Sequence, residues 1–391
     1  MRKVWLLGFG AFAIGTDLFI LGGILPALAA SLSTTQAAAG QAVTVFAVVY
    51  AVATPVIAAT TAHLPPRRVL VAALTVFTAA NLGTAMSPTL SVLLATRGVA
   101  ALGAAAFTPA AVGTATALVS AQHRGRAVAV VMSGLNGAIA VGVPAGTTLA
   151  QTFTWRAALL LVAAMGACAA VAIGAALGDP PAQESGAASL RVRVGLLAHP
   201  RILSVLAVTT FAVGAGITAY TYIADILHAT VDVDGTVLTV LLVLYGIGAF
   251  VGSLASGVLT DHVGADATIT GTLLLLLLTL LVVPLAGSVT VVAVIALVWG
   301  AAMVAFTPPQ QHRLIAEAPD QPTVAVSLNS SALYLGEALG AGAGGIALGI
   351  GVGFVHLPWV AAALALVAIA THMLTTHRAR TSGASTAAPQ R

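Results

Sequence analysis

The chain has 391 residues, of which 59% are hydrophobic and only 7% charged, and its net charge is +4. A soluble globular protein carries about 25% charged residues, so this chain cannot cover a water-facing surface and is expected in a lipid bilayer. Its basic residues do not cluster on a soluble segment, which argues against nucleic acid as a partner.

Apolar runs of membrane-spanning length follow one another along the whole chain. About 20 apolar residues of helix cross a hydrocarbon core of about 30 Å, and no run alternates as a membrane β-strand would. Breaks at Pro, Gly and charged residues predict twelve transmembrane helices. They lie at about 4–30, 38–62, 67–88, 90–118, 125–151, 156–178, 201–228, 235–260, 267–287, 289–309, 322–352 and 355–376.

A polar segment at 179–200 separates two groups of six predicted helices. It is interpreted as a cytoplasmic linker between an N-terminal bundle at 1–178 and a C-terminal bundle at 201–376. The small, polar and basic tail at 377–391 is predicted to be disordered. The sequence therefore predicts an all-α membrane protein of two pseudo-symmetric six-helix bundles.

The distribution of Arg and Lys predicts the orientation of the helices. Short cytoplasmic loops retain positive residues. With the N-terminus in the cytoplasm, every Arg and Lys except Arg97 and Arg156 lies on the cytoplasmic side or in a cytoplasmic terminus. Both termini are therefore predicted to be cytoplasmic.

One stretch of the first helix recurs in the second half. FAIGTDLFILGGILPAL at 12–28 is echoed by FAVGAGITAYTYIADIL at 211–227. In this alignment Asp17 faces Gly216, and Pro26 faces Asp225, so each half keeps one acid at a different depth. Duplicated bundles of this kind form a binding site near the bilayer midplane, between the halves.

Three acids lie inside predicted spans: Asp17, Asp225 and Glu337. A carboxylate without a partner in a medium of low dielectric constant favours its neutral form, so proton exchange at these positions is expected. Two other interpretations stay open, namely that Asp225 faces water at the outer interface and that Glu337 makes a polar contact between helices. Four further polar residues could bond a substrate or pack helices: Asn136, Asn329, Tyr222 and Tyr334.

Two loops carry residues suited to joining helices at the cytoplasmic side. The first, GVLTDHVG at 257–264, contains Gly257, which would let two helices approach, and Asp261, which could accept a hydrogen bond from a helix N-terminus, before it ends at Gly264. The second, ATTAHLPPRR at 59–68, has no acid but ends in Arg67 and Arg68. Simple anchoring of the topology by charge is the alternative for both loops.

Two helices carry further patterns. In the fourth predicted span, Arg97 precedes Gly103 by six residues, and a buried Arg should find an acid, line water or extend to the outer interface. The fifth span reads GAIAVGVPAG, in which small residues permit close packing and proline removes one backbone hydrogen bond. Its marked positions are Gly137, Gly142, Pro144 and Gly146.

These patterns resemble the major facilitator superfamily, in particular its twelve-helix drug:proton antiporters, which include bacterial chloramphenicol, arabinose and purine exporters. The loop at 257–264 resembles the motif G-x-L-x-D-R-x-G-R-R, with His262 in place of Arg and without the basic pair. Arg97 and Gly103 resemble R-x5-G, and Trp155 with Arg156 matches a W-R pair after the glycine-rich helix. Segments resembling P-x-Q-x-R, L-N-x-S and T-Y-I-x-P follow at 308–313, 328–331 and 221–225, with Asp225 in place of the last proline.

The resemblance implies proton-coupled efflux of a small organic molecule, an antibiotic or drug-like metabolite, by a monomer without cofactor in the inner membrane of a bacterium. It makes Asp17 the first candidate proton carrier and Glu337 the second, with Arg97 in a relay or gating role. Export of a sugar or nucleobase is the alternative within the fold. A membrane enzyme or sensor would need a catalytic cluster or a soluble domain, and the sequence contains no Walker loop, metal-ligand spacing or nucleophile elbow.

Overall fold

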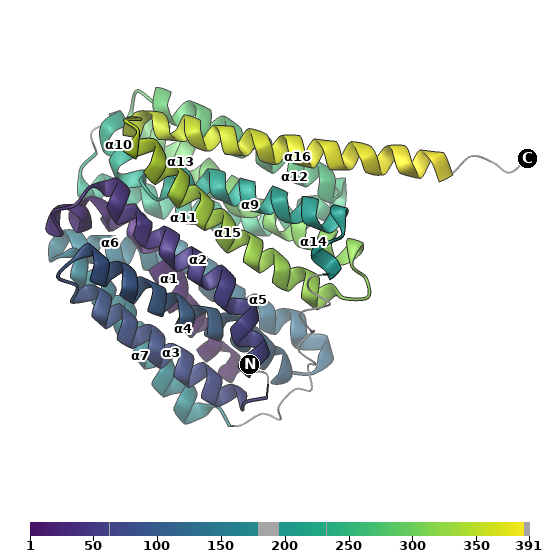
Figure 1. Ribbon diagram of the computed structural model, residues 1–391, viewed down its shortest axis with the longest axis horizontal. Helices are drawn as coiled ribbons and strands as arrows, with labels where there is room; N and C mark the ends of the chain where they lie inside the picture. The colour runs from purple at the N-terminus through teal and green to yellow at the C-terminus, as the bar shows by residue number, and fades with distance from the viewer. Residues whose placement is uncertain (62, 179–194, 232, 387–391) are drawn as a thin grey trace, which may run out of the picture.

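The computed structural model describes residues 1–61, 63–178, 195–231 and 233–386. Within these residues the chain is helical apart from short turns, and no strand is present. Helices satisfy their backbone hydrogen bonds internally, as a lipid environment requires. Figure 1 shows the two halves as two groups of helices, the first purple to blue and the second teal to yellow.

In the first half, the fifth predicted span is divided by a π-helical turn, η2, that precedes Pro144. A proline lacks the N–H group that would bond the carbonyl four residues before it, and such gaps are a usual cause of irregular turns in helices. The helices of this half are α1 (Arg2–Ser31), α2 (Gln36–Thr61), α3 (Pro66–Ala85), α4 (Leu90–Ala117), α5 (Arg124–Gly137), η2 (Ala138–Gly142), α6 (Val143–Thr152) and α7 (Trp155–Ala176).

In the second half, two predicted spans are interrupted. The seventh breaks at 221–222, between α9 and α10, and the tenth bends at Phe306, where Pro308 and Pro309 begin the next helix without N–H groups of their own. The helices of this half are α9 (Pro200–Tyr220), α10 (Ile223–Val231), α11 (Gly235–Val263), α12 (Ala265–Val282), α13 (Val289–Ala305), α14 (Thr307–Glu317), α15 (Pro322–Gly349) and α16 (Leu357–Thr386).

Eleven stretches within the described residues are long and apolar enough to cross a membrane. The remaining long helix is α15, which has 28 residues but is diluted by glycines and by polar residues such as Asn329 and Glu337. It packs along both α9 and α2, so its polar positions are shared with neighbouring helices rather than with lipid. The structure thus agrees with the predicted all-α membrane protein.

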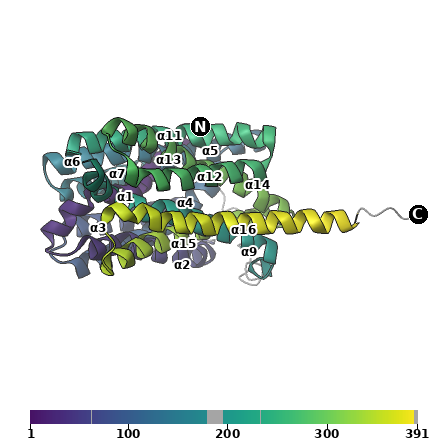
Figure 2. The same ribbon diagram turned by 90° about the horizontal axis from the view of Figure 1, so that it is seen from above.

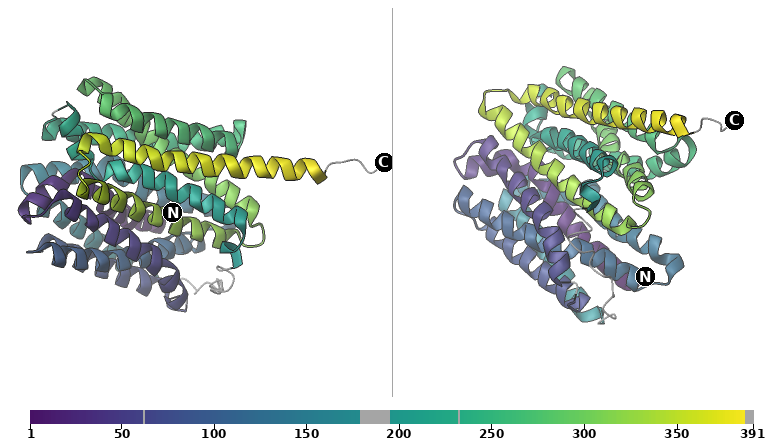
Figure 3. Two further views of the ribbon diagram at one scale, coloured as in Figure 1. Left: turned by 45° about the horizontal axis from the view of Figure 1, so that its top comes forward. Right: turned by 45° about the vertical axis from the view of Figure 1, so that its right-hand side comes forward.

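The outer surface of the bundle is apolar. Large side chains such as Leu254, Leu278 and Leu366 are more than half exposed, which suits contact with lipid tails. The interior contains the buried acids, and the first half meets the second where α2 lies along α15 and where η2 and α6 lie along α11. Figure 2 and Figure 3 show the same arrangement from other sides.

The end of the chain differs from the prediction. Helix α16 extends beyond the other helices and continues to Thr386, so residues 377–386 are helical and not a disordered tail. No proline interrupts this stretch, and Arg and Ala within it are good helix formers. Residues 387–391 and most of the predicted linker, 179–194, lie outside the described residues.

Candidate functional site

Asp17 of α1 and Arg97 of α4 form a buried ion pair. Nη1 of Arg97 donates a hydrogen bond to Oδ1 of Asp17 at 2.5 Å, and the two side chains are 0% and 1% exposed. The Arg97 guanidinium also lies 4.5 Å from the ring centroid of Phe46 on α2, and Asn81 of α3 is buried near Asp17, with its Nδ2 atom donating a hydrogen bond of 3.1 Å to the Phe77 carbonyl. The charge of Asp17 is therefore balanced within the first half, and Arg97 does not extend to the outer interface.

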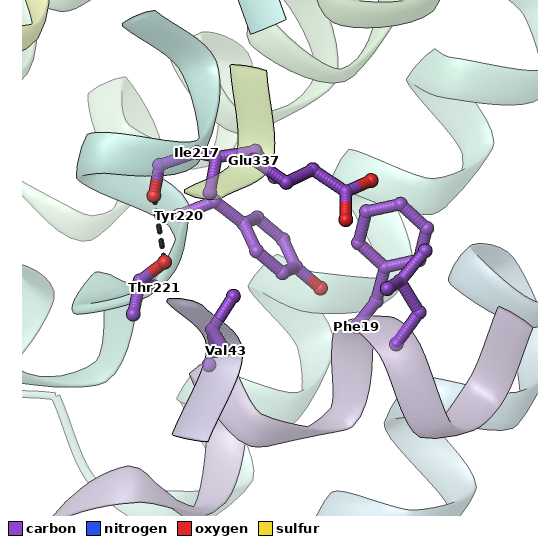
Figure 4. A pocket seen from close by; sticks show the side chains of 8 residues that line it. Phe19, Val43, Ile217, Tyr220, Thr221 and Glu337 are labelled. Atoms are coloured by element: carbon purple, nitrogen blue, oxygen red, sulfur yellow. Dashed lines mark hydrogen bonds between the residues drawn. The ribbon is translucent and has the colours of Figure 1, made fainter. Parts of the chain in front are cut away.

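Glu337 has no such partner. It lies near the middle of α15, is 7% exposed, and its Oε2 atom accepts no hydrogen bond within the described part of the chain. It lines a narrow cavity with a volume of about 10 Å³, which is room for about one water molecule. Figure 4 shows its carboxylate directed toward the Phe19 ring, with the Tyr220 hydroxyl on the same side. The cavity residues are Leu18, Phe19, Gly22, Val43, Ile217, Tyr220, Thr221 and Glu337.

This cavity lies between the two halves, and the repeated stretches supply two of its walls. Leu18 and Gly22 come from the first copy, and their equivalents in the alignment, Ile217 and Thr221, come from the second. The remaining walls come from α2 and α15. Equivalent positions of the two repeats therefore face each other across the seam, as expected for a site between duplicated bundles.

Tyr334 precedes Glu337 by one helical turn and connects the halves. Its ring stacks on Tyr50 of α2, with 3.5 Å between the ring centroids. Tyr222 also lies at the seam, because a Cβ atom at Gly40 of α2 would be 2.2 Å from its hydroxyl. That hydroxyl donates a long hydrogen bond of 3.5 Å to the Ala341 carbonyl. Both tyrosines thus face the partner half as well as their own.

Asp225 is only partly buried and lies in α10, at the end of the bundle away from the N-terminus. Its Oδ1 atom accepts a hydrogen bond of 2.8 Å from Nε2 of Gln36, the first residue of α2. Thr239 and Gln151 form a second, longer hydrogen bond of 3.5 Å between the halves. These are the two hydrogen bonds found between the halves within the described ranges, and both lie at this same end.

The two candidate asparagines have different surroundings. Asn329 of α15 is 1% exposed and accepts a hydrogen bond of 2.9 Å from Thr209 of α9, and Gln310 of α14 bonds the same hydroxyl at 3.4 Å. Asn329 therefore joins helices of the second half and does not reach the cavity. Asn136 of α5 is partly exposed and does not line the cavity.

The glycine-rich fifth span packs against α1. A Cβ atom at Gly142 would be 2.0 Å from Oγ1 of Thr16, and one at Gly146 would be 2.0 Å from Ile20. Pro144 is the second residue of α6, which follows the π-helical turn. Gly137 makes no such approach, since nothing lies within 4 Å of its would-be Cβ atom.

Gly103 allows α4 to approach α3, where a Cβ atom would be 2.7 Å from the backbone of Ala73 and Phe77. This approach lies between Arg97 and the C-terminal end of α4, so it belongs to helix packing in the first half. Among the positions marked by sequence, Gly103, Gly142 and Gly146 are those where a larger side chain would meet neighbouring atoms.

The segment at 257–264 differs from its prediction, because residues 257–263 are the end of α11 and not a loop. Gly257 has open space around it, so it does not bring two helices together. Asp261 is exposed, and no hydrogen bond or ion pair of its side chain is found among the described residues. Gly264 is needed for another reason, since its φ of 86° lies in the left-handed region that favours glycine and allows the turn into α12. The corresponding segment of the first half, 59–68, also makes few side-chain contacts with other helices. Arg67 donates a hydrogen bond to the Gly174 carbonyl of α7, and Arg68 is exposed.

Sequence reasoning did not single out several residues of these contacts. Tyr50, Gln36 and Asn81 lie in spans with no repeated or charged pattern around them. Sequence reasoning also missed a polar cluster in the second half. There Arg313 forms an ion pair with Asp266 at 3.2 Å and a hydrogen bond with His372 at 2.9 Å. The polar character of these residues within apolar helices was the available signal, but it does not identify partners that lie far apart in sequence.

Metal binding has no support from the side chains described. No three His, Cys, Asp or Glu residues come together within the described ranges. What the interior does contain is one balanced ion pair, one unpartnered acid, and a cavity at a seam between two helical bundles. Such an interior is typical of membrane transporters built from two helical bundles.

Comparison with known proteins gives the family. The sequence model of the Major Facilitator Superfamily matches residues 7–222 and 202–390. The chain belongs to this superfamily of transporters and is a multi-pass membrane protein, not an enzyme.

Relatives and solved structures resemble the chain over nearly its full length. It is 33% identical to the inner membrane transport protein YdhP of Escherichia coli strain K12, with 93% of each chain covered. It is 32% identical to a chloramphenicol resistance protein of Streptomyces lividans, with 94% of each covered. The crystal structure of the nucleoside transporter NupG superposes with a TM-score of 0.75 at 14% identity, covering 96% of this chain and 99% of that one, which shows the shared fold.

Proposed function

We propose that this protein exports a small organic molecule in exchange for protons, by exposing the cavity at Glu337 to each side of the membrane in turn. The observation that carries the proposal is the buried carboxylate of Glu337, which lies between the halves and whose Oε2 atom has no hydrogen-bond partner among the described residues. The relation to a chloramphenicol resistance protein supports an antibiotic or drug-like molecule as the substrate.

Charge balance explains why Glu337 is suited to coupling. A buried charge without a partner is costly, so a lone carboxylate is stable only when a proton or another positive group balances it. Asp17 already has Arg97 at 2.5 Å. Proton exchange at Asp17 would need this ion pair to separate, whereas exchange at Glu337 needs only access to water. We therefore assign the exchangeable proton to Glu337 and a gating role to the Asp17–Arg97 pair.

The direction of transport follows from the proposed orientation, with both termini in the cytoplasm of a bacterial inner membrane. Asp225 and Gln36 then join the halves at the outer side, together with Thr239 and Gln151. Opening the cavity outward breaks these bonds. A proton that enters from outside releases the substrate, and loss of that proton to the cytoplasm restores the affinity for the next molecule.

The test uses the purified full chain in liposomes with an imposed pH gradient. Chloramphenicol, a pentose and a nucleoside are offered as substrates, with and without a protonophore. We expect gradient-driven movement of one compound, its loss in Glu337→Gln, and retention of exchange at equal concentrations, because that exchange needs no proton. Glu317→Gln is the matched control, since Glu317 is an acid at the end of α14, 3.8 Å from Arg201 and outside the cavity. Unchanged gradient-driven movement in Glu337→Gln would contradict the proposal.

A further inference from the structure

Two polar groups line the narrow cavity between the halves and have no hydrogen-bond partner among the described residues. They are Oε2 of Glu337 and the hydroxyl of Tyr220, whose side chains are 7% and 3% exposed. Figure 4 shows the carboxylate and the hydroxyl directed toward the same side, where Phe19 lies. Buried polar atoms in native proteins are nearly always bonded to the protein or to ordered water, so these two groups require a partner that the chain does not supply.

The size and the lining of the cavity identify this partner. Its volume of about 10 Å³ is about what one water molecule needs, and a buried water usually makes about three hydrogen bonds. Glu337 and Tyr220 supply two of them. The Thr221 hydroxyl, which donates to the Ile217 carbonyl at 2.8 Å, keeps acceptor capacity for a third. Among the described residues that line the cavity none is basic, so the missing partner is not a positive side chain.

Tyr220 borders the cavity from the end of the bundle that carries α10. A Cβ atom at Gly344 of α15 would be 3.3 Å from the Thr218 carbonyl of α9, and Gly344 lies seven residues beyond Glu337, or about two helical turns. Tyr220 is therefore nearer to that end than Glu337 is. Side chains of a helix lean toward its N-terminus, so the Tyr220 ring extends back toward Glu337. In the orientation proposed above, a proton from outside reaches this side of the cavity first.

We propose that the cavity holds one water molecule that connects Tyr220 to Glu337, and that Tyr220 is a positioning residue for the proton exchange of Glu337 at this water. The inference rests on the proposed export function and adds a residue to it. When Glu337 is ionised, Tyr220 donates its O–H to the water, and the water donates to Oε2. When Glu337 is protonated, its O–H donates to the water, and the water donates to the Tyr220 oxygen. A tyrosine hydroxyl can both donate and accept, so the bridge serves both states.

The proton transfer through this bridge needs no other side chain. When the outer end opens, a hydronium ion reaches the bridging water and gives it one proton. The bridging water passes one of its own protons to Oε2 of Glu337, and the hydronium ion becomes a water molecule. One O–H bond forms at Glu337, and one O–H bond of the hydronium ion is broken. Tyr220 keeps its proton throughout, and only the direction of its hydrogen bond changes.

No other titratable group among the described residues supplies this link. Tyr50 of α2 and Tyr334 of α15 interact with Glu337, but their rings stack on each other and neither residue lines the cavity. Helices α14 and α16 also pack on α15, and neither contributes a residue to the cavity. Arg97 is bound to Asp17. The hydroxyl of Tyr220 is thus the group available to orient a water at Oε2.

The experiment uses the purified full-length protein in lipid and follows its protonation by infrared difference spectroscopy as the pH is changed. The carboxyl band of Glu337 is identified by its loss in Glu337→Gln. Repeating the titration in water that carries a heavy oxygen isotope identifies bands of bound water. We expect one water O–H band that shifts with the isotope, changes together with the Glu337 band, and disappears in Tyr220→Phe. If no isotope-sensitive band accompanies the Glu337 band, the cavity is dry and the inference is wrong.

The pH dependence tests the role of Tyr220. Tyr220→Phe keeps the ring that packs on Phe19, at 5.7 Å between the centroids, and removes only the hydroxyl. A hydrogen bond to a carboxylate is stronger than one to a neutral carboxyl group, so its loss should disfavour ionisation. We expect the pH midpoint of the Glu337 band to rise by about one unit, which is about a tenfold change in proton affinity. The midpoint of gradient-driven export should rise with it.

Tyr245→Phe is the matched control. It removes a hydroxyl from the ring beside Tyr220, at 5.0 Å between the centroids, and Tyr245 does not line the cavity. This variant should keep the midpoint of the native protein. An unchanged midpoint in Tyr220→Phe, or equal shifts in the two variants, would overturn the inference.

A second variant displaces the water and leaves both polar residues in place. Val43→Ile adds one carbon atom at the wall of a cavity that has room for about one water. We expect the same rise in midpoint as in Tyr220→Phe, and no further rise when the two changes are combined, because both act through the same water. Additive shifts would show that Tyr220 acts without the water, against the inference.

The outcome also separates this inference from the proposed function. Gradient-driven export that depends on Glu337 and keeps its pH midpoint in Tyr220→Phe would overturn the water bridge and leave proton-coupled export standing. A water band and a raised midpoint in Tyr220→Phe, without gradient-driven movement of any compound, would support the water bridge and contradict the export function.

Discussion

Breaking the buried ion pair of Asp17 and Arg97 should have a large effect on stability. The pair is 2.5 Å apart and almost fully buried. At an effective dielectric constant of about 20, that separation gives about 7 kcal/mol of attraction before desolvation is counted. Removing one partner of such a pair generally costs about 3–5 kcal/mol, because the other charge is left buried and unpaired. We expect Asp17→Asn to lie near the lower figure, since an amide oxygen still accepts one hydrogen bond.

A double-mutant cycle tests this reasoning. Unfolding in mixed micelles with increasing dodecyl sulfate can be followed by the fluorescence of the four tryptophans. Asp17→Asn and Arg97→Met should each destabilise the protein, and the double variant should recover at least half of the summed loss because no charge remains buried. Asp17→Asn should still insert in the membrane but lose gradient-driven export. Additive losses in the double variant, or single losses below about 1 kcal/mol, would refute the argument.

Two predictions concern glycines. Gly142→Ala places a Cβ atom 2.0 Å from Oγ1 of Thr16, and we expect the free energy of unfolding to fall by about 1–3 kcal/mol from overpacking. Adding Thr16→Ala should restore part of this stability in the same unfolding assay. If it restores none, the contact with Thr16 is not the cause. Gly264→Ala should cost about 1–2 kcal/mol because its φ is 86°, whereas Gly257→Ala, which meets open space inside α11, should be neutral or slightly stabilising. Equal effects of these last two changes would show that the left-handed turn is not the cause.

The positions of the helices were largely predictable. Apolar length, proline and charge mark where a chain can enter and leave a bilayer, and the observed helix ends lie within a few residues of the predicted ones for most spans. The exceptions have local causes. The π-helical turn before Pro144, the break after Tyr220 and the bend at Phe306 depend on how a missing backbone bond is accommodated, and the extension of α16 depends on helix propensity beyond the apolar stretch.

The candidate site was predicted as a set of residues and not as an arrangement. Polar residues in apolar helices identified Asp17, Arg97 and Glu337 individually, because each is expensive to bury. Pattern alone could not say that Arg97 on α4 would balance Asp17 on α1, since the two are 80 residues apart and either acid was available as its partner. Because of that pairing, the proposal above assigns the exchangeable proton to Glu337 and not to Asp17.

Composition and the positions of the polar residues determined, without any structure, that this chain is a duplicated helical membrane protein with acids in its interior. The physical reason is that lipid tolerates few charged groups and requires backbone hydrogen bonds to be made within the protein. Both requirements are visible in the sequence as long apolar stretches with few charged residues. Tertiary structure alone decided which acid is paired and which is free, because electrostatic balance depends on distances between helices. It also placed Glu337, Tyr220 and Phe19 around one cavity, a result of packing between halves that no local pattern records.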